Sequence, residues 1–298
     1  MYHAFGTIVT AVVTPFGPDG SVDHEVFRRI LRHLEANGSD SVVVAGTTGE
    51  SPTLSDDEKL ALVATAVDEL GGRLPVLAGT GTNHTAHSVE LTRRAIEAGA
   101  DGVLVTAPYY NNPPREGLLR HFTAVAAAAG DAPVMLYNIP ARSVISLDPE
   151  LVAELARVSN IVAIKQAKPD LPDLHAIRSL APDLAVYAGD DASLLPFLPE
   201  GVLGVVSVAS HLVGSQMKDV VELWQAGNES DARELGERLE DVYETLGITT
   251  NPIPVKAAMQ LLGFEVGAPR LPLVEASGMQ RERIRAMLER HELSALHA

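Results

Sequence analysis

Eight short apolar runs recur along the chain, and their regular spacing restricts the possible fold more than any other feature of the sequence. Each run is rich in β-branched residues and is continuous rather than alternating, the pattern of strands that are covered on both faces. Successive runs begin roughly 20–35 residues apart, the length of a strand–helix–strand unit. The predicted strands are residues 8–13, 41–45, 75–78, 102–106, 134–137, 161–165, 184–188 and 202–208.

Helical patterns fill the intervals between these runs. In the stretch 21–38, Asp23 can cap the start of a helix and Gly38 can end it, while Ser55 and Glu58 have the spacing of a capping box. Eight strands that alternate with helices over about 225 residues predict a (β/α)8 barrel, or TIM barrel. A doubly wound sheet is the competing fold, but no Gly-x-Gly-x-x-Gly follows the first predicted strand.

The last quarter of the chain carries no strand pattern. Its periodicity predicts three helices, over residues 231–246, 254–262 and 277–293. We therefore expect a barrel catalytic domain over residues 1–224 and a C-terminal helical subdomain over residues 225–298, which is too small to be expected to fold alone.

The composition argues against several classes of function. With 23 basic and 39 acidic side chains, the chain has a formal charge of −16, which repels nucleic-acid phosphates and anionic membrane surfaces. The apolar runs are too short for a membrane span, and the N-terminal stretch is expected to be a first strand rather than a signal peptide. The sequence has no cysteine, which excludes disulfides and thiolate chemistry and fits a cytoplasmic location.

One lysine stands at the end of an apolar run, within the segment NIVAIKQAKPDL. Lys165 directly follows four apolar residues, although lysine is rarely fully buried. Active sites of such barrels lie where the strands end, and a low-dielectric interior favours a neutral amine that can attack a carbonyl to form a Schiff base. The residues alone also allow a lysine that extends to solvent or pairs with a carboxylate. Lys168, in the following loop, is expected at the surface.

Other polar residues follow the neighbouring strands. Tyr137 ends the strand before that of Lys165, and a strand spacing of about 4.8 Å would bring its phenol near the lysine. The segment GTTGES offers hydroxyls and amides suited to a carboxylate, and Arg142 offers a guanidinium for another. Each has an ordinary alternative: a packed tyrosine, a glycine turn and a surface ion pair. The segment GDD at 189–191 is expected to form a turn and helix cap, and no metal-ligand spacing is found at these strand ends.

Taken together, these motifs resemble a known family. Nearly end to end, the chain is similar to the N-acetylneuraminate lyase superfamily of class I aldolases and, within it, to the dihydrodipicolinate synthases. The motifs that carry the resemblance are AGTTGES, GTGTN, APYYNNPP, YNIPAR, VAIKQA, AGDD and NPIPVKAA. The resemblance implies a (β/α)8 barrel with a C-terminal helical domain, usually in a homotetramer, and a reaction without cofactor or metal.

The resemblance also implies catalytic roles for four residues. Lys165 would form a Schiff base with pyruvate, whose enamine would then add to L-aspartate 4-semialdehyde. Tyr137, Thr47 and Tyr110 resemble the proton-relay triad of the family, in which the residue matching Tyr110 comes from a neighbouring subunit. The product's own amine would close a six-membered ring and release the enzyme.

Four further residues match binding positions of the family. Thr48 and the adjoining amides would hold the pyruvate carboxylate, Arg142 would hold the carboxylate of the second substrate, and Gly189 and the main chain around Val206 would line the site. Some relatives act instead on sialic acid or 2-keto-3-deoxy sugar acids, and a non-catalytic binding or regulatory relative is a further alternative. Arg142, the PYYN segment and NPIPVK favour the synthase over the first alternative, and retention of the catalytic lysine, tyrosine and threonine argues against the second.

One departure from part of the family concerns regulation by lysine, the end product of the pathway. The lysine-sensitive pattern has two histidines and a glutamate where this sequence has Asp56, Lys59 and His87, although Asn83 and Tyr109 are retained. An ammonium at Lys59 would repel those of free lysine, so the sequence predicts weak or absent inhibition. The alternative is a Lys59 that turns to solvent, pairs with a nearby aspartate and leaves a usable pocket.

Overall fold

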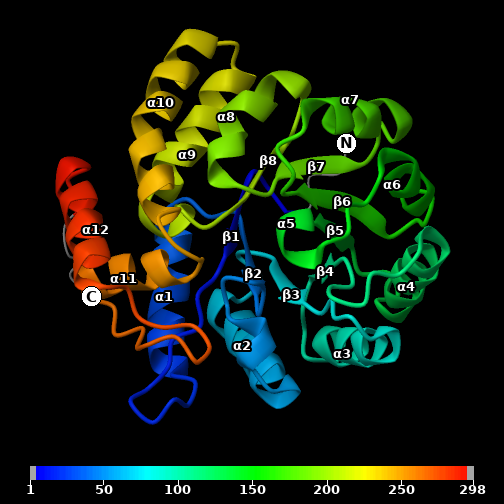
Figure 1. Ribbon diagram of the computed structural model, residues 1–298, viewed down its shortest axis with the longest axis horizontal. Helices are drawn as coiled ribbons and strands as arrows, with labels where there is room; N and C mark the ends of the chain where they lie inside the picture. Colours follow the sequence, from blue (N-terminus) through cyan, green and yellow to red (C-terminus); the bar gives the residue numbers. More distant parts are fainter. Residues whose placement is uncertain (1–4, 294–298) are drawn as a thin grey trace.

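The computed structural model describes residues 5–293 and shows a closed barrel of eight parallel strands (Figure 1). The strands follow one another around the barrel in sequence order, and the last pairs with the first. The (β/α)8 prediction is confirmed, since each predicted run overlaps one strand. The strands are β1 Ile8–Ala11, β2 Ser41–Val44, β3 Val76–Gly79, β4 Gly102–Thr106, β5 Val134–Asn138, β6 Ile161–Gln166, β7 Ala185–Ala188 and β8 Gly204–Ser207.

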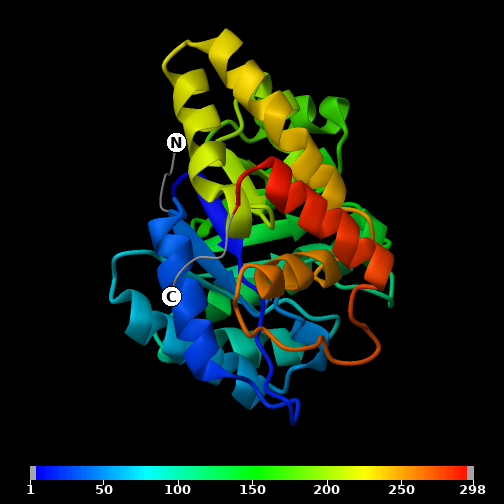
Figure 2. The same ribbon diagram turned by 90° about the vertical axis from the view of Figure 1, so that its left-hand side faces the viewer.

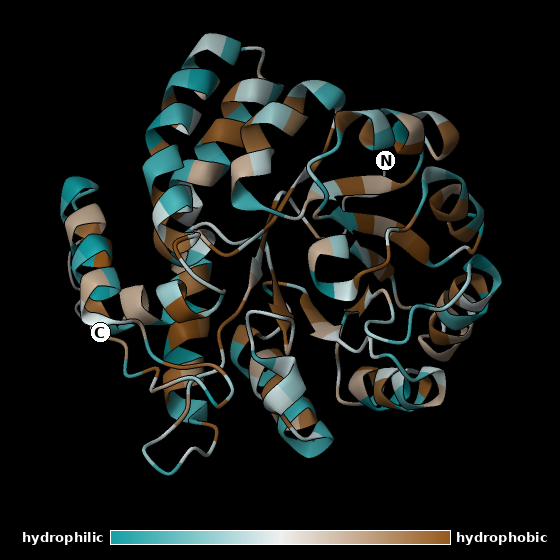
Figure 3. Cartoon of the chain, in the orientation of Figure 1, coloured by the Kyte–Doolittle hydropathy of each residue, from teal (hydrophilic) through white to brown (hydrophobic). Residues whose placement is uncertain are grey.

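Helices alternate with the strands and cover the outside of the barrel. Figure 3 shows apolar residues along the strands and polar residues on much of the outer helix surface. The helices as far as the end of the barrel are α1 His24–Ala36, α2 Asp56–Leu70, α3 Thr85–Glu97, α4 Arg115–Ala128, α5 Pro140–Ser143, α6 Pro149–Leu155, α7 Leu171–Leu180, α8 Leu194–Phe197 and α9 Ser210–Gln225.

The predicted helix boundaries have the expected hydrogen bonds. The Asp23 carboxylate accepts the N–H of Val26 at the start of α1. Ser55 and Glu58 form a complete capping box at the start of α2, which ends at Gly71 with a left-handed backbone, φ +54°. These caps satisfy N–H groups that a helix start otherwise leaves without partners.

Three more helices follow the barrel: α10 Glu229–Leu246, α11 Ile253–Leu261 and α12 Gly278–Arg290. They overlap the three helices predicted for this region. Figure 2 shows α11 and α12 side by side on one flank of the molecule, where α11 packs against both α12 and α9. The domain boundary at residues 224/225 stays a prediction. No helix within residues 5–293 has the length and apolar character needed to cross a membrane.

The inside of the barrel has its own apolar core, separate from the core between strands and helices. Phe5, Leu77 and Met135 are buried there, and the Tyr187 hydroxyl donates to the carbonyl of Gly6 at 2.9 Å. The alternate side chains of the strands fill this interior, as expected for a packed barrel rather than a pore. Polar side chains therefore gather where the strands end.

Two buried histidines predict that the fold loses stability in mild acid. Burial lowers the pKa of both His121 and His211 to about 4 from an ordinary value near 6.5. Below pH 6.5 these two histidines take up protons in the unfolded chain but stay neutral in the folded chain. The free energy of unfolding therefore falls as the pH drops toward 4. The loss approaches about 3 kcal/mol for each histidine. The raised pKa of buried Asp191 opposes this trend.

Urea unfolding at pH 7 and at pH 5 measures the effect. His121→Gln removes the titrating group and should reduce the difference in midpoint between the two pH values. Leu118→Val, at a buried residue of the same helix that does not titrate, is the matched control; it should lower both midpoints and leave the difference between them unchanged. Equal midpoints at both pH values in the unmodified protein would contradict the prediction.

Candidate active site

A cavity of about 310 Å³ lies at the carboxyl ends of the strands, and every predicted site residue except Tyr110 lines it. We call it the inner cavity. Its floor is formed by Ala11, Val43 and Leu104, which belong to the core inside the barrel. Residues of the C-terminal region, among them Tyr243 and Asn251, close one side. The site residues that line it are Thr47, Thr48, Tyr137, Arg142, Lys165, Gly189 and Val206.

Lys165 and Tyr137 lie side by side in this cavity. They are paired residues of the neighbouring strands β6 and β5, as predicted, and are 5% and 3% exposed. The Lys165 Nζ lies 4.4 Å from the centroid of the Tyr137 ring. Within residues 5–293 no carboxylate pairs with this Nζ and no hydrogen bond engages it. The alternatives of an ion-paired lysine and of a lysine at the surface are therefore wrong.

Two other lysines are buried, which the sequence analysis missed. Lys59 is 7% exposed and Lys256 is 1% exposed, but each has a carboxylate partner, Asp56 or Glu50. The sequence signal for Lys256 was its position among the apolar residues of NPIPVKAA. Lys168, expected at the surface, is half-buried and bound to Asp170 of its own loop and to Asp173 in the first turn of α7.

The loop after β2 brings two threonine hydroxyls to the cavity. Thr48 is buried, and its Oγ1 accepts a hydrogen bond from the Asn251 Nδ2 at 3.0 Å. The backbone N–H groups of Thr47 and Thr48 donate to no group within residues 5–293. Gly79 at the end of β3 lets this loop approach closely, because a Cβ there would lie 2.4 Å from the Ala45 carbonyl oxygen. The loop can thus offer both hydroxyls and amides to an anion.

Arg142 belongs to α5, a one-turn helix that the sequence analysis did not predict. Its side chain is exposed, and its Nη2 lies 3.5 Å from the Asn251 carbonyl oxygen. Arg142 forms no ion pair with another part of the chain that the structure describes, so its proposed role does not compete with a structural salt bridge. It lines the inner cavity and also a neighbouring one.

The GDD segment fixes the wall opposite the loop after β2. A Cβ on Gly189 would lie 2.6 Å from the Cβ of Ala167, so only glycine allows the ends of β6 and β7 to come this close. Asp190 caps the following turn, as predicted. The Asp191 carboxylate accepts hydrogen bonds from the backbone N–H groups of Val208 and Ala209 and so anchors the end of β8. The sequence did not reveal this role. Burial raises the pKa of its carboxyl group.

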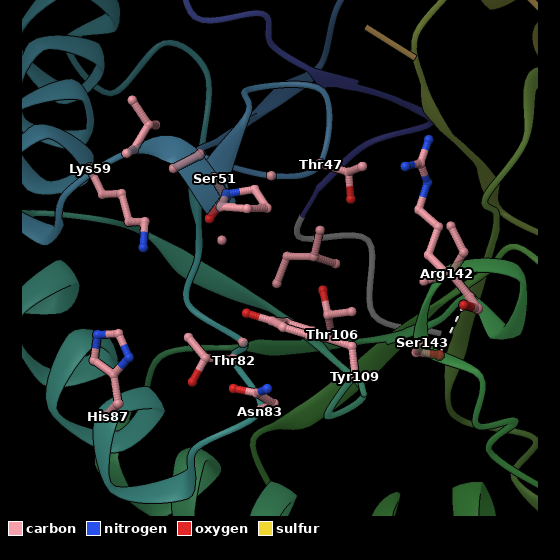
Figure 4. A pocket seen from close by; sticks show the side chains of 18 of the residues that line it. Thr47, Ser51, Lys59, Thr82, Asn83, His87, Thr106, Tyr109, Arg142 and Ser143 are labelled. Atoms are coloured by element: carbon pink, nitrogen blue, oxygen red, sulfur yellow. Dashed lines mark hydrogen bonds between the residues drawn. The ribbon is translucent and has the colours of Figure 1, made fainter. Parts of the chain in front are cut away.

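A larger cavity of about 610 Å³ adjoins the inner cavity at Thr47 and Arg142, and we call it the side cavity (Figure 4). Lys59 and His87 lie on the side opposite Arg142. Asp56 links them, 3.4 Å from the Lys59 Nζ and 2.7 Å from the His87 Nε2. Although burial raises the pKa of Asp56, the hydrogen bond from His87 and the Lys59 charge hold it below its usual range. The alternative interpretation of Lys59 is correct in part: the side chain pairs with an aspartate, but it is buried and does not turn to solvent.

Tyr110 is the one predicted site residue that lies away from the inner cavity. It lines the side cavity, yet it is 90% exposed, with a left-handed backbone of φ +75°. Val144 shares both features on the same cavity, 74% exposed with φ +70°. A left-handed backbone is costly for residues other than glycine. It persists where the surrounding structure constrains it, often at functional sites. The structure therefore holds two apolar side chains outward at the edge of the site.

Comparisons with known proteins agree with this geometry. Residues 4–291 match the model of the dihydrodipicolinate synthetase family. A 4-hydroxy-tetrahydrodipicolinate synthase of Symbiobacterium thermophilum is 49% identical over 286 residues, 95% of this chain and 97% of that protein. A solved dihydrodipicolinate synthase of Cyanidioschyzon merolae with lysine bound has a TM-score of 0.96 at 42% identity, covering 98% of this chain and 100% of that one. A pyruvate complex of the Acinetobacter baumannii enzyme has a TM-score of 0.91 at 35% identity, covering 96% and 98%. The chain belongs to the dihydrodipicolinate synthetase family.

Proposed function

We propose that Lys165 is the residue through which this 4-hydroxy-tetrahydrodipicolinate synthase, a lyase, condenses pyruvate with L-aspartate 4-semialdehyde in lysine and diaminopimelate biosynthesis. The observation that carries the proposal is an amine buried in the inner cavity beside Tyr137, without an ion-pair partner in the described chain. An amine that lines the cavity and has no carboxylate partner in the described chain can reach a substrate carbonyl carbon, whereas the ion-paired Lys256 is held by Glu50.

The proposed reaction needs only side chains and substrates. The Lys165 amine adds to the pyruvate carbonyl, and loss of water gives an iminium that yields an enamine when the methyl group gives up a proton. The enamine carbon bonds to the aldehyde carbon of the semialdehyde, whose oxygen takes up a proton. The amino group of that substrate then attacks the iminium carbon, and the bond to Lys165 breaks as the six-membered ring closes. Tyr137 and Thr47, which line the cavity, would carry these protons.

Two separate anion sites support two acidic substrates. Thr48 and the adjoining amides, beside Lys165, are suited to the pyruvate carboxylate. Arg142, at the junction of the two cavities, is suited to the carboxylate of the semialdehyde. Gly189, which follows β7, and Val206, on β8, line the wall of the inner cavity on that side.

Arg142→Ala is expected to weaken use of the semialdehyde and to leave pyruvate binding intact. Removal of one partner of a buried charge pair costs roughly 2–5 kcal/mol, and we expect the lower end because Arg142 is exposed in the free chain. That corresponds to a loss of about 30-fold in kcat/KM for the semialdehyde. Steady-state kinetics with each substrate varied in turn measure it.

Arg120→Ala, at an exposed arginine paired with Glu116 on α4, is the matched control and should behave like the unmodified enzyme. An unchanged KM and kcat for the semialdehyde in Arg142→Ala would remove Arg142 from the site. The same assay distinguishes the other substrates of the superfamily. Cleavage of sialic acid or of a 2-keto-3-deoxy sugar acid faster than consumption of the semialdehyde would overturn the assignment of the second substrate.

L-Lysine at millimolar concentration is expected to inhibit the enzyme little or not at all. The C. merolae relative binds lysine. Here the buried Lys59 ammonium lines the side cavity, and the Asp56 carboxylate beside it already bonds to Lys59 and His87. Like charges brought together in this way cost several kcal/mol, and each 1.4 kcal/mol weakens binding tenfold. An initial-rate titration with L-lysine at saturating pyruvate tests this prediction.

The double variant Lys59→His/His87→Glu is the control for the lysine titration. It removes the opposing ammonium and supplies an anionic partner, so it should respond to lower lysine concentrations than the unmodified enzyme. Half-inhibition of the unmodified enzyme below about 1 mM would show that the charge argument fails.

We also propose that the enzyme works in the cytoplasm as a homo-oligomer, a tetramer in the pattern of the family. The exposure of Tyr110 and Val144 supports an association that covers them. A cysteine-free sequence fits a reducing compartment.

A further inference from the structure

A buried ion pair joins the C-terminal helices to the loop that carries Thr47 and Thr48. Lys256 on α11 and Glu50, two residues after Thr48, have side chains that are 2% and 0% exposed, and the Lys256 Nζ donates to the Glu50 Oε1 at 2.8 Å. The same Nζ also donates to the carbonyls of Thr14 at 3.1 Å and Ala268 at 3.4 Å. All three N–H groups of the ammonium are therefore used, and burial, which lowers the pKa of Lys256, is opposed by the Glu50 charge.

Glu50 is held from a second direction. Its other carboxylate oxygen, Oε2, accepts the backbone N–H of Arg270 at 2.8 Å. Its own backbone N–H donates to the Thr47 carbonyl at 3.1 Å, and its φ is +57°, in the left-handed region. A non-glycine residue keeps that conformation when its surroundings fix it strongly. The two donors to the Glu50 carboxylate provide such a constraint at the end of the loop.

Arg270 extends the attachment to the following segment. Its Nη1 donates to the Thr53 carbonyl at 2.7 Å and to the Glu58 Oε2 at 3.0 Å. Both cations contact the Phe16 ring, whose centroid is 4.5 Å from the Lys256 Nζ and 4.4 Å from the Arg270 Cζ. Four positions between the loop after β2 and the start of α2 are thus hydrogen-bonded to residues more than two hundred positions later in the chain: Thr48, Glu50, Thr53 and Glu58.

This attachment supports the face of the loop that lines the inner cavity. The threonines project from the same short loop whose end Glu50 fixes, and Asn251, just before α11, bonds the Thr48 hydroxyl. A shift of the loop would therefore move both hydroxyls relative to Lys165, and displacements on the scale of an ångström strongly slow reactions that depend on orientation.

We propose that Glu50 and Lys256 are positioning residues, whose buried ion pair sets the place of the Thr47 and Thr48 hydroxyls opposite Lys165. The inference rests on the proposed roles of Lys165 and Thr48 in holding pyruvate. In this proposal Lys256 affects the reaction by positioning the loop, and its amine does not contact a substrate.

Glu50→Gln is the primary test, because the amide keeps the size of the side chain but turns an N–H group toward one of its two donors. We expect KM for pyruvate to rise at least tenfold, while borohydride still traps pyruvate on Lys165 at saturating pyruvate. Lys256→Met should shift KM in the same direction. Circular dichroism and the unfolding midpoint establish that each variant is folded at the assay temperature; Glu50→Gln suffices if Lys256→Met does not fold.

Lys218→Met is the matched control, because the Lys218–Asp40 pair, 2.6 Å apart, likewise ties a helix to the barrel but lies away from the inner cavity. It should lower stability without changing KM for pyruvate. A double-mutant cycle then distinguishes positioning from general destabilisation. If Glu50 acts through Thr48, the effect of Glu50→Gln on KM should largely disappear in a Thr48→Val background.

An unchanged KM for pyruvate in folded Glu50→Gln, or effects of Glu50→Gln and Thr48→Val that simply add, would overturn the inference. Either outcome would leave the proposed function standing, provided that the unmodified enzyme forms the pyruvate adduct. Failure of the unmodified enzyme to form that adduct would instead refute the proposed role of Lys165, and this inference with it.

Discussion

Borohydride reduction in the presence of pyruvate is expected to attach pyruvate covalently to Lys165, and Lys165→Ala is expected to abolish both the adduct and turnover. The imine forms at the Lys165 amine in the inner cavity, and reduction fixes it as a stable secondary amine. Alanine leaves no nucleophile in that place, so no partial activity should remain. Intact-protein mass spectrometry followed by peptide mapping measures the adduct and locates it.

Three other lysines serve as controls for this result. Lys168→Ala changes a lysine only three residues away, which is bound to Asp170 and Asp173, and should retain the full adduct. Lys59 and Lys256 are buried but paired with carboxylates, so neither should carry the modification. An adduct on any of these lysines, or none at all, would refute the Schiff-base proposal.

The fold and the central pair of the site follow from signals that are local in the sequence. Each strand appears as a continuous apolar run, because both faces of a barrel strand are covered. Once the strands are in order, neighbours in sequence are neighbours in space, so Tyr137 could be placed beside Lys165 without knowledge of any long-range contact. The observed pairing of these two residues across β5 and β6 confirms that step.

Contacts between the barrel and the C-terminal helices could not be obtained in this way. Glu50 and Lys256 lie 206 positions apart, and Thr48 and Asn251 lie 203 apart. No periodicity connects such residues, because the separation depends on how the last helices fold back over the barrel. For the same reason the sequence analysis missed the burial of Lys256, whose partner Glu50 lies in the barrel.

Backbone conformation at the edge of the site was also beyond prediction. The motif PYYN indicates a loop with two tyrosines, but not that Tyr110 has φ +75° and is 90% exposed while Tyr109 remains half-buried. A left-handed tyrosine is unfavourable by intrinsic preference, so its occurrence depends on the surrounding structure. The exposure of Tyr110 is nevertheless what makes the assignment of that residue testable.

Tyr110→Phe is expected to lose most turnover while pyruvate still forms its adduct on Lys165. The substitution removes a phenolic hydroxyl that is proposed to relay protons in a neighbouring subunit, and it keeps the ring. Because Tyr110 is 90% exposed in the single chain, its hydroxyl contributes little to the stability of the subunit, and the unfolding midpoint should not change. Tyr109→Phe, at the adjacent residue, is the matched control. A fully active monomer in sedimentation analysis would contradict the role in association.

Mixing two inactive variants distinguishes a tyrosine that acts in its own subunit from one that acts across an interface. Consider a mixed dimer of one Lys165→Ala chain and one Tyr110→Phe chain, joined by a symmetric interface. If Tyr110 crosses to the partner, this dimer contains one site with both residues intact. Random reassortment makes half of the dimers mixed, and each has one competent site of two, so about a quarter of the original activity should return. If Tyr110 serves its own chain, every site in the mixture lacks one of the two groups, and the activity stays at the level of the separate variants.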